Sequence, residues 1–93
     1  MKIGILTIEI FMYNNHNLKE KRTILNSLKK RLRNNFNISL IEADDYEKWQ
    51  KATLVIVAAG KDNASVDSCF AGIIDFLDRD DQVQLVRHRT EII

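Results

Sequence analysis

The chain has 93 residues, of which 45% are hydrophobic and 29% are charged, and its formal net charge is +1. This length predicts one domain spanning residues 1–93, with a core that needs no metal or disulfide to hold it. No apolar run approaches the roughly eighteen residues of a membrane span, and the single Cys69 excludes an internal disulfide. We expect a cytoplasmic protein, because the N-terminal apolar run also lacks a signal-peptide cleavage site.

The near-zero net charge conceals two segments of opposite sign. Between Leu18 and Asn34 there are seven basic residues against Glu20 alone, a local charge of +6. Between Asp62 and Asp81 there are six aspartates against one arginine, a local charge of −5. The distribution of charge, rather than its total, therefore points to a partner.

Residues 2–11 predict a strand, because they are rich in β-branched side chains. Alternation gives this strand one uniformly apolar face toward the helices, made of Gly4, Leu6, Ile8 and Ile10. The opposite face carries Ile3, Ile5, Thr7, Glu9 and Phe11. Asparagines in the segment 13–16 predict a loop after the strand.

The segment from Asn17 to about Asn34 predicts the best-defined helix. Asn17 is a favourable N-cap, and Glu20 follows three residues later as in a capping box. At the helical period, an apolar arc forms from Leu18, Ile24, Leu25, Leu28 and Leu32. Beside it lies a group that we call the basic flank, which comprises Lys19, Arg22, Lys29, Lys30 and Arg33.

Lys21 falls inside the apolar arc instead of the basic flank. We expect its stem to pack and its amine to reach water past the edge of the sheet. A functional amine is the alternative.

Two strands are predicted next, at 36–43 and 52–59, and the second is continuously apolar, as a central strand is. The polar segment 44–51 between them predicts a turn or a short helix. A second helix starts from a cap at Asp62 or Asn63 and runs to about residue 77. Its apolar stripe comprises Val66, Cys69, Phe70, Ile73, Ile74 and Leu77.

The last predicted strand covers residues 82–92, with Val83 and Leu85 on one face and Val86 on the other. The order strand–helix–strand–strand–helix–strand consists of two split βαβ units. Right-handed crossovers then predict an α+β fold of the ferredoxin-like type, a four-stranded antiparallel sheet with both helices on one face.

Two motifs resemble those of the YlxP-like family of small bacterial proteins. His16-Asn17-Leu18-Lys19-Glu20-Lys21-Arg22 is similar to the family's Ser-Leu-Lys-x-Lys-Arg helix start, and Trp49-Gln50-Lys51-Ala52 to its Trp-Gln-Arg-Ala strand start. Asn17 replaces the usual Ser and Lys51 the usual Arg, which preserves capping and charge. The resemblance implies a ferredoxin-like fold and supplies no activity or catalytic residues. The family's genes tend to lie among translation-initiation and ribosome-maturation genes, which suggests ribosome or RNA association.

Motifs for catalysis, cofactors and metals are absent from the sequence. The three glycines form no phosphate-binding loop, and His16 and His88 are isolated. Cys69 lies in an apolar stripe, where a buried small hydrophobe is favoured over a nucleophile. Glu42 and Asp44 are close in sequence, yet nothing beside them assigns acid and base roles. We therefore predict a non-enzymatic protein without cofactor or metal.

The basic flank gives the main functional hypothesis, which is binding to structured RNA such as ribosomal RNA or a ribosomal particle. Arg87 and Arg89 could add to it, and Tyr13, His16 and Trp49 could stack on bases if exposed. For Trp49, packing in the connection is the favoured alternative. The competing interpretation of the flank is that it neutralises the acidic second helix, its neighbour on the sheet.

The open face of the predicted sheet gives an alternative function. Ile3, Ile5 and Phe11 point away from the helices, and Val57 or Leu54 is expected to join them. Such a patch favours a protein-interaction or homodimerisation module. A third class, sensing of a small molecule, rests on analogy with other ferredoxin-like folds.

Overall fold

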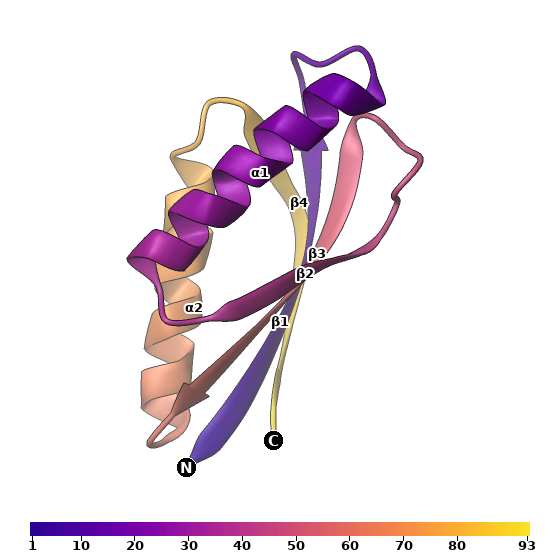
Figure 1. Ribbon diagram of the computed structural model, residues 1–93. Coiled ribbons are helices and arrows are strands. Elements are labelled where there is room, and N and C mark those ends of the chain that lie inside the picture. Colours follow the sequence, from indigo (N-terminus) through magenta and orange to yellow (C-terminus); the bar gives the residue numbers. More distant parts are fainter.

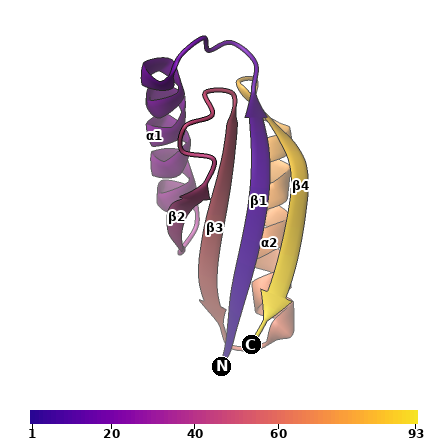
Figure 2. The same cartoon turned by 90° about the vertical axis from the view of Figure 1, so that its right-hand side faces the viewer.

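The computed structural model describes all 93 residues and confirms the predicted order of elements. The elements are β1 (Lys2–Met12), α1 (Leu18–Asn35), β2 (Ser39–Asp44), β3 (Lys51–Gly60), α2 (Asn63–Asp78) and β4 (Val83–Ile92). The strands form one antiparallel sheet in the order β2-β3-β1-β4, and both helices cover the same face (Figure 1). Figure 2 shows the open face, with α1 beside β2 and α2 behind β1 and β4. This is the ferredoxin-like α+β fold that the sequence predicts.

The core lies between the sheet and the two helices. The predicted apolar face of β1 is buried, and Met12 extends it by one more position. The helices contribute Ile24, Leu25, Leu28 and Leu32 from α1, and Val66, Phe70, Ile73 and Leu77 from α2. Leu18 was expected in this set, but it is exposed, because the first turn of α1 lines a hollow in the surface.

Gly4 lets α2 lie directly on β1. A Cβ atom at this position would stand 2.3 Å from Cγ1 of Val66 and 2.7 Å from Cε2 of Phe70. These distances are far shorter than van der Waals contact. The absent side chain is therefore what allows the two buried side chains of α2 to fill this end of the core.

β2 is shorter than predicted, since it begins at Ser39 instead of residue 36. Phe36 ends α1, where its N–H donates to the carbonyl of Leu32 at 2.9 Å. Its ring meets that of Phe76 edge-on, with 5.9 Å between centroids, and covers Gly72. The segment before β2 thus joins the two helices, because an aromatic contact in the core outweighs local strand alternation.

The connection between β2 and β3 is an irregular loop with a turn at residues 46–47, so of the two predicted alternatives the turn is correct and the helix is not. Asp45 turns the chain with a φ of 67°, in the left-handed region that aspartate tolerates better than most residues. In β3, Leu54 is fully buried against the helices, so of the two candidates Val57 alone belongs to the open face.

The pairing of β1 with β4 contains a bulge. The register shifts between Glu9 and Ile10, which pair with Arg87 and Leu85 respectively, so Val86 has no partner of its own. Val86 is exposed, whereas Val83 is buried and Leu85 packs against the core, as the alternation in the sequence predicts. Beyond the bulge β4 is regular.

Candidate nucleic-acid interface

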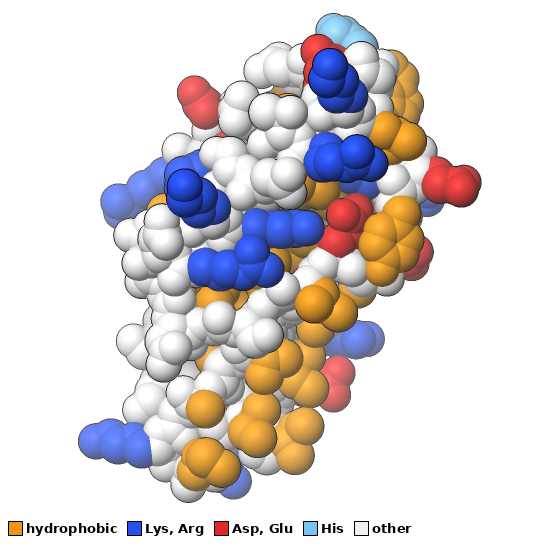
Figure 3. All heavy atoms as spheres, in the orientation of Figure 1, with side chains coloured by type: hydrophobic (Ala, Val, Ile, Leu, Met, Phe, Trp, Pro, Cys, Tyr) orange, Lys and Arg blue, Asp and Glu red, His pale blue; other side chains and the backbone are white.

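The basic flank lies on the solvent side of α1. Lys19, Arg22, Lys30 and Arg33 are exposed and Lys29 is half-buried. None of the five forms an ion pair with a carboxylate. In Figure 3, Lys and Arg side chains gather over the part of the surface that α1 occupies. The structure therefore brings the five predicted residues onto one surface.

The N-terminal cap sets the rotational position of this helix. Oδ1 of Asn17 accepts a hydrogen bond from the N–H of Glu20 at 2.9 Å. The carboxylate of Glu20 accepts in turn from the N–H of His16 at 2.6 Å, one residue before the position used in the usual capping box. Two backbone donors at the start of α1 are thereby satisfied.

The acidic segment between Asp62 and Asp81 neutralises one basic residue of α1, Arg31, which lies outside the basic flank. Its Nη1 lies 2.7 Å from Oδ2 of Asp80, and its guanidinium lies over the ring of Phe76 at 5.9 Å. Burial opposes ionisation of Asp80, but hydrogen bonds from Arg31 and from the N–H of Gln82 outweigh it and lower the pKa of this carboxyl. At the C-terminal end of α2, Asp75 pairs with the following cap residue Arg79 at 3.0 Å. The acidic segment thus leaves the basic flank unpaired.

Arg33 also has a structural contact. Its Nη2 donates to the carbonyl of Leu40 at 3.1 Å, on the edge strand β2. The guanidinium carries further donors, and the residue is exposed. Arg33 therefore fastens α1 to the sheet while its charge still faces solvent.

A hollow of about 270 Å³ separates α1 from the β2–β3 connection. Arg22 and Lys29 of the basic flank line it together with Leu18, Lys21, Leu25, Asn26, Glu42 and Tyr46. Tyr46 is 60% exposed, and its hydroxyl donates to the carbonyl of Glu42 at 2.8 Å, which holds the ring in place. The sequence gives no signal for this position of Tyr46 beside α1, because the position depends on the path of an irregular loop.

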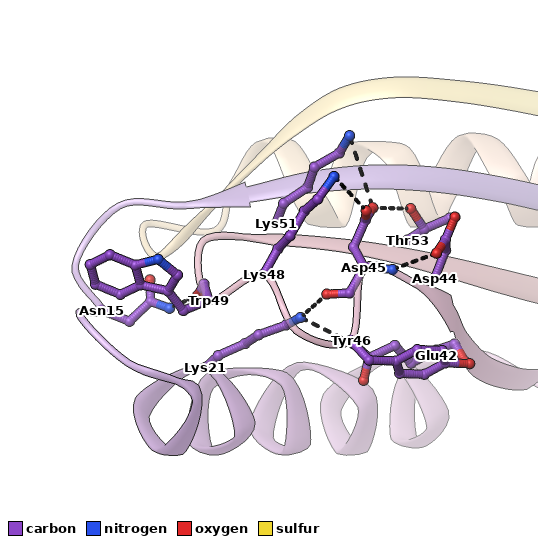
Figure 4. Close-up of polar contacts among 10 residues, drawn as sticks. All are labelled: Asn15, Lys21, Glu42, Asp44, Asp45, Tyr46, Lys48, Trp49, Lys51 and Thr53. Atoms are coloured by element: carbon purple, nitrogen blue, oxygen red, sulfur yellow. Dashed lines mark hydrogen bonds and ion pairs between the residues drawn. The ribbon is translucent and has the colours of Figure 1, made fainter.

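Lys21 does not reach water as expected. Its side chain is 3% exposed, and its Nζ donates to the carbonyl of Asp45 at 2.6 Å and lies 3.3 Å from Oε2 of Glu42 (Figure 4). A buried ammonium requires such partners, because desolvation without them is costly. The amine therefore bridges α1 to the β2–β3 connection.

Asp45 continues this polar network on the other side of the loop. Its carboxylate accepts from Oγ1 of Thr53 at 2.8 Å and lies 3.2 Å from Nζ of Lys48 and 3.9 Å from Nζ of Lys51. The hydrogen bond from Thr53, aided by Lys48, holds the pKa of Asp45 below its usual value. These contacts fix a loop that has no regular secondary structure.

Two of the three candidate stacking residues lie at the N-terminal end of α1. Trp49 is 41% exposed, and its ring centroid is 6.2 Å from that of His16. The buried side-chain amide of Asn15 donates to the carbonyl of Trp49 and ties the two loops together. Tyr13 lies elsewhere, against Phe11 and Gln84. Trp49 is thus half packed and half open to solvent.

Arg87 and Arg89 do not join the basic flank. Both lie on the open face of the sheet, where Arg87 is 3.6 Å from Glu9 and Arg89 is 3.7 Å from Glu91. The helices cover the opposite face (Figure 2). The sequence could not exclude this pair, because the bulge at Val86 reverses the alternation and moves Arg87 and Arg89 to the face opposite Val83 and Leu85.

The remaining chemistry of the chain offers no further constellation. Cys69 is partly buried on α2, and burial raises the pKa of its thiol, which disfavours the thiolate. No group of three or more His, Cys, Asp or Glu side chains is placed to hold a metal ion. Neither helix has the length and apolar character needed to cross a membrane.

Comparison with known proteins agrees with the resemblance described above. A family model described as "Protein of unknown function (DUF503)" matches residues 3–90, which include parts of all six elements. The chain is also 28% identical over 89 residues to the uncharacterized protein YlxP of Bacillus subtilis (strain 168), covering 96% of this chain and 97% of that protein. The chain therefore belongs to the DUF503 family of proteins of unknown function.

Proposed function

We propose that this protein binds structured RNA in the cytoplasm, in the form of ribosomal RNA or a ribosomal particle, and that it acts by binding, not by catalysis. One observation carries the proposal. The five cations of the basic flank, four of them exposed and Lys29 half-buried, lie on one helix without a carboxylate partner. An acidic helix lies in the same layer of the fold and leaves them free.

The dimensions of the flank suit a phosphate backbone. From Lys19 to Arg33 the helix advances about 21 Å, at 1.5 Å per residue, which is long enough to meet several phosphates. Each neutralised phosphate releases counterions, so binding weakens as salt rises. With five cations engaged, the slope of log K against log salt is about −4.

The hollow beside the flank favours RNA with unpaired bases. Arg22 and Lys29 provide charge at its wall, and the ring of Tyr46 is largely exposed beside them. Bases that are splayed out of RNA loops stack on aromatic rings, with their phosphates held by basic side chains. His16 and Trp49 offer a second such surface at the start of α1.

Anisotropy titrations with a labelled ribosomal RNA hairpin between about 50 and 200 mM salt test this proposal. The Lys29→Glu/Lys30→Glu variant is expected to bind at least tenfold more weakly, with a salt slope reduced by about two. Lys2→Glu/Lys61→Glu is the matched control, because it makes the same charge change at exposed, unpaired sites near the N-terminal end of β1. The proposal fails if wild type does not bind at low salt, or if both variants weaken binding equally.

Self-association through the open sheet face is the second candidate. Its apolar half carries Ile3 and Val57, both exposed, and Ile41, which is 61% exposed. The other half is charged, since Glu9 pairs with Lys51 at 3.2 Å and with Arg87. A face-to-face dimer would bury the apolar halves against each other. Val57→Lys should then produce monomers in sedimentation, and an unchanged dimer would exclude this contact.

A further inference from the structure

The outer edge of β4 has unpaired backbone groups. Ile3 and Ile93 exchange two backbone hydrogen bonds, at 3.2 and 2.8 Å. Bonded pairs alternate along an antiparallel ladder, so the register assigns Glu91, Arg89 and Arg87 to β1. The N–H and C=O groups of His88, Thr90 and Ile92 consequently point away from the sheet.

The two edges of the sheet differ in protection. β2 has six residues, and Arg33 of α1 occupies the carbonyl of Leu40. β4 has ten residues, six of which follow the bulge in regular register. No hydrogen bond reaches the backbone groups of His88 or Thr90, and the sequence has no proline to block them. A bare, regular edge of this kind is a template for strand addition.

We propose that β4 pairs with β4 of a second copy of this chain, antiparallel about a twofold axis at Thr90. The outward-pointing backbone N–H and C=O groups of the two strands then form hydrogen-bonded residue pairs. Thr90 pairs with Thr90 of the second copy, and the pair between His88 and Ile92 occurs twice by symmetry. These pairs supply about six backbone hydrogen bonds. The two sheets merge into one of eight strands, and the helices of both copies stay on the same side.

Charge selects this register and favours a second copy over an unrelated strand. With the axis at Thr90, Arg89 lies opposite Glu91 of the partner subunit, and symmetry forms this pair twice. Cross-strand pairs of opposite charge are favourable and like charges are not. A shift that instead pairs His88 with Thr90 also sets Arg87 opposite Glu91, but it places Arg89 opposite Arg89. The register centred on Thr90 is thus the one that forms opposite-charge pairs without a like-charge pair, as a stable twofold contact favours.

Sedimentation equilibrium up to about 500 μM tests the contact, a range that detects micromolar dissociation constants. We expect wild type to sediment with twice the 10.8 kDa mass of the chain. Thr90→Pro should be monomeric and retain its circular dichroism, because proline is tolerated where the N–H faces away from the neighbouring strand. A monomeric wild type over this range overturns the proposal.

Charge exchange tests the register without proline. Arg89→Glu and Glu91→Arg should each weaken the dimer at least tenfold, since symmetry creates two like-charge pairs. Mixing the two variants should restore the dimer, because at positions 89 and 91 one chain then carries only glutamate and the other only arginine. Lys61→Glu is the charge control, expected to dimerise as wild type does.

A dimer that survives Arg89→Glu, or a mixture that stays monomeric, overturns the β4 contact. Loss of the dimer in Val57→Lys alone would assign it to the open face instead. RNA binding through the basic flank is measured separately, so failure of either proposal leaves the other intact.

Discussion

Replacing Lys21 by methionine removes a buried charge and keeps an unbranched apolar stem in the same space. The ammonium makes a hydrogen bond to the carbonyl of Asp45 and an ion pair with Glu42, whose side chain is 18% exposed. Interactions of this kind contribute about 1.5–3 kcal/mol each. Methionine carries no charge and so does not incur the desolvation cost of the ammonium, which offsets part of the free energy lost with these two contacts. We expect a net destabilisation of about 2 kcal/mol, or roughly 10 °C in Tm for a chain of this size.

Urea denaturation of Lys21→Met, Glu42→Gln and the double variant gives the coupling between the two side chains. We expect a coupling free energy of about 1 kcal/mol or more from this double-mutant cycle, because the ammonium and the carboxylate are shielded from bulk water. A variant as stable as wild type would show that desolvation of the lysine cancels its bonds, and would refute this reasoning.

Three further predictions concern the core and its edges. Asp80→Asn should lose about 1–2 kcal/mol at pH 7, because it weakens the contact with Arg31. The pKa of the Asp80 carboxyl is lower in the folded protein than in the unfolded chain, so the ionised carboxyl contributes its full stabilisation above about pH 4. This contribution is lost as the pH falls through the pKa of the folded state. The urea midpoints of the variant and of wild type should therefore converge as the pH is lowered. Gly4→Ala should cost about 1–3 kcal/mol in thermal melts, because its methyl group overlaps Val66, and an unchanged Tm would contradict the close approach of α2. Cys69 should react slowly with a thiol reagent at pH 7 and rapidly in urea, given its raised pKa and partial burial, and fast reaction of the native protein would count against this placement.

The sequence predicts most of this fold because its signals are local. Asn17 caps α1 and Asp62 caps α2 through contacts three residues away, which any reader of the sequence can find. The alternation in β1 likewise reports its buried face. The strand expected from residue 36 is the exception, because Phe36 packs against Phe76, forty positions later, and nothing near Phe36 indicates that contact.

The sequence predicts the charged residues of the candidate site, but it does not predict the residues that contact them. The basic flank follows from helical spacing alone. The partners of Lys21 lie in a loop whose path depends on Asp45, and Tyr46 reaches the hollow through the same loop. Arg31 was one of seven basic residues in its segment, and its pairing with Asp80 spans 49 positions. Contacts of this range are set by the assembled fold and leave no pattern in the sequence.

The contact between Arg33 and Leu40 has a consequence for how far the protein can assemble. A sheet with two bare edges can add copies at both ends and grow into a fibre. Here Arg33 of α1 occupies one acceptor of β2, the carbonyl of Leu40. On the proposed β4 pairing, the outer edges of the dimer are its two β2 strands, and this contact disfavours the addition of further copies there. Arg33 would then limit open-ended polymerisation in addition to its place in the basic flank.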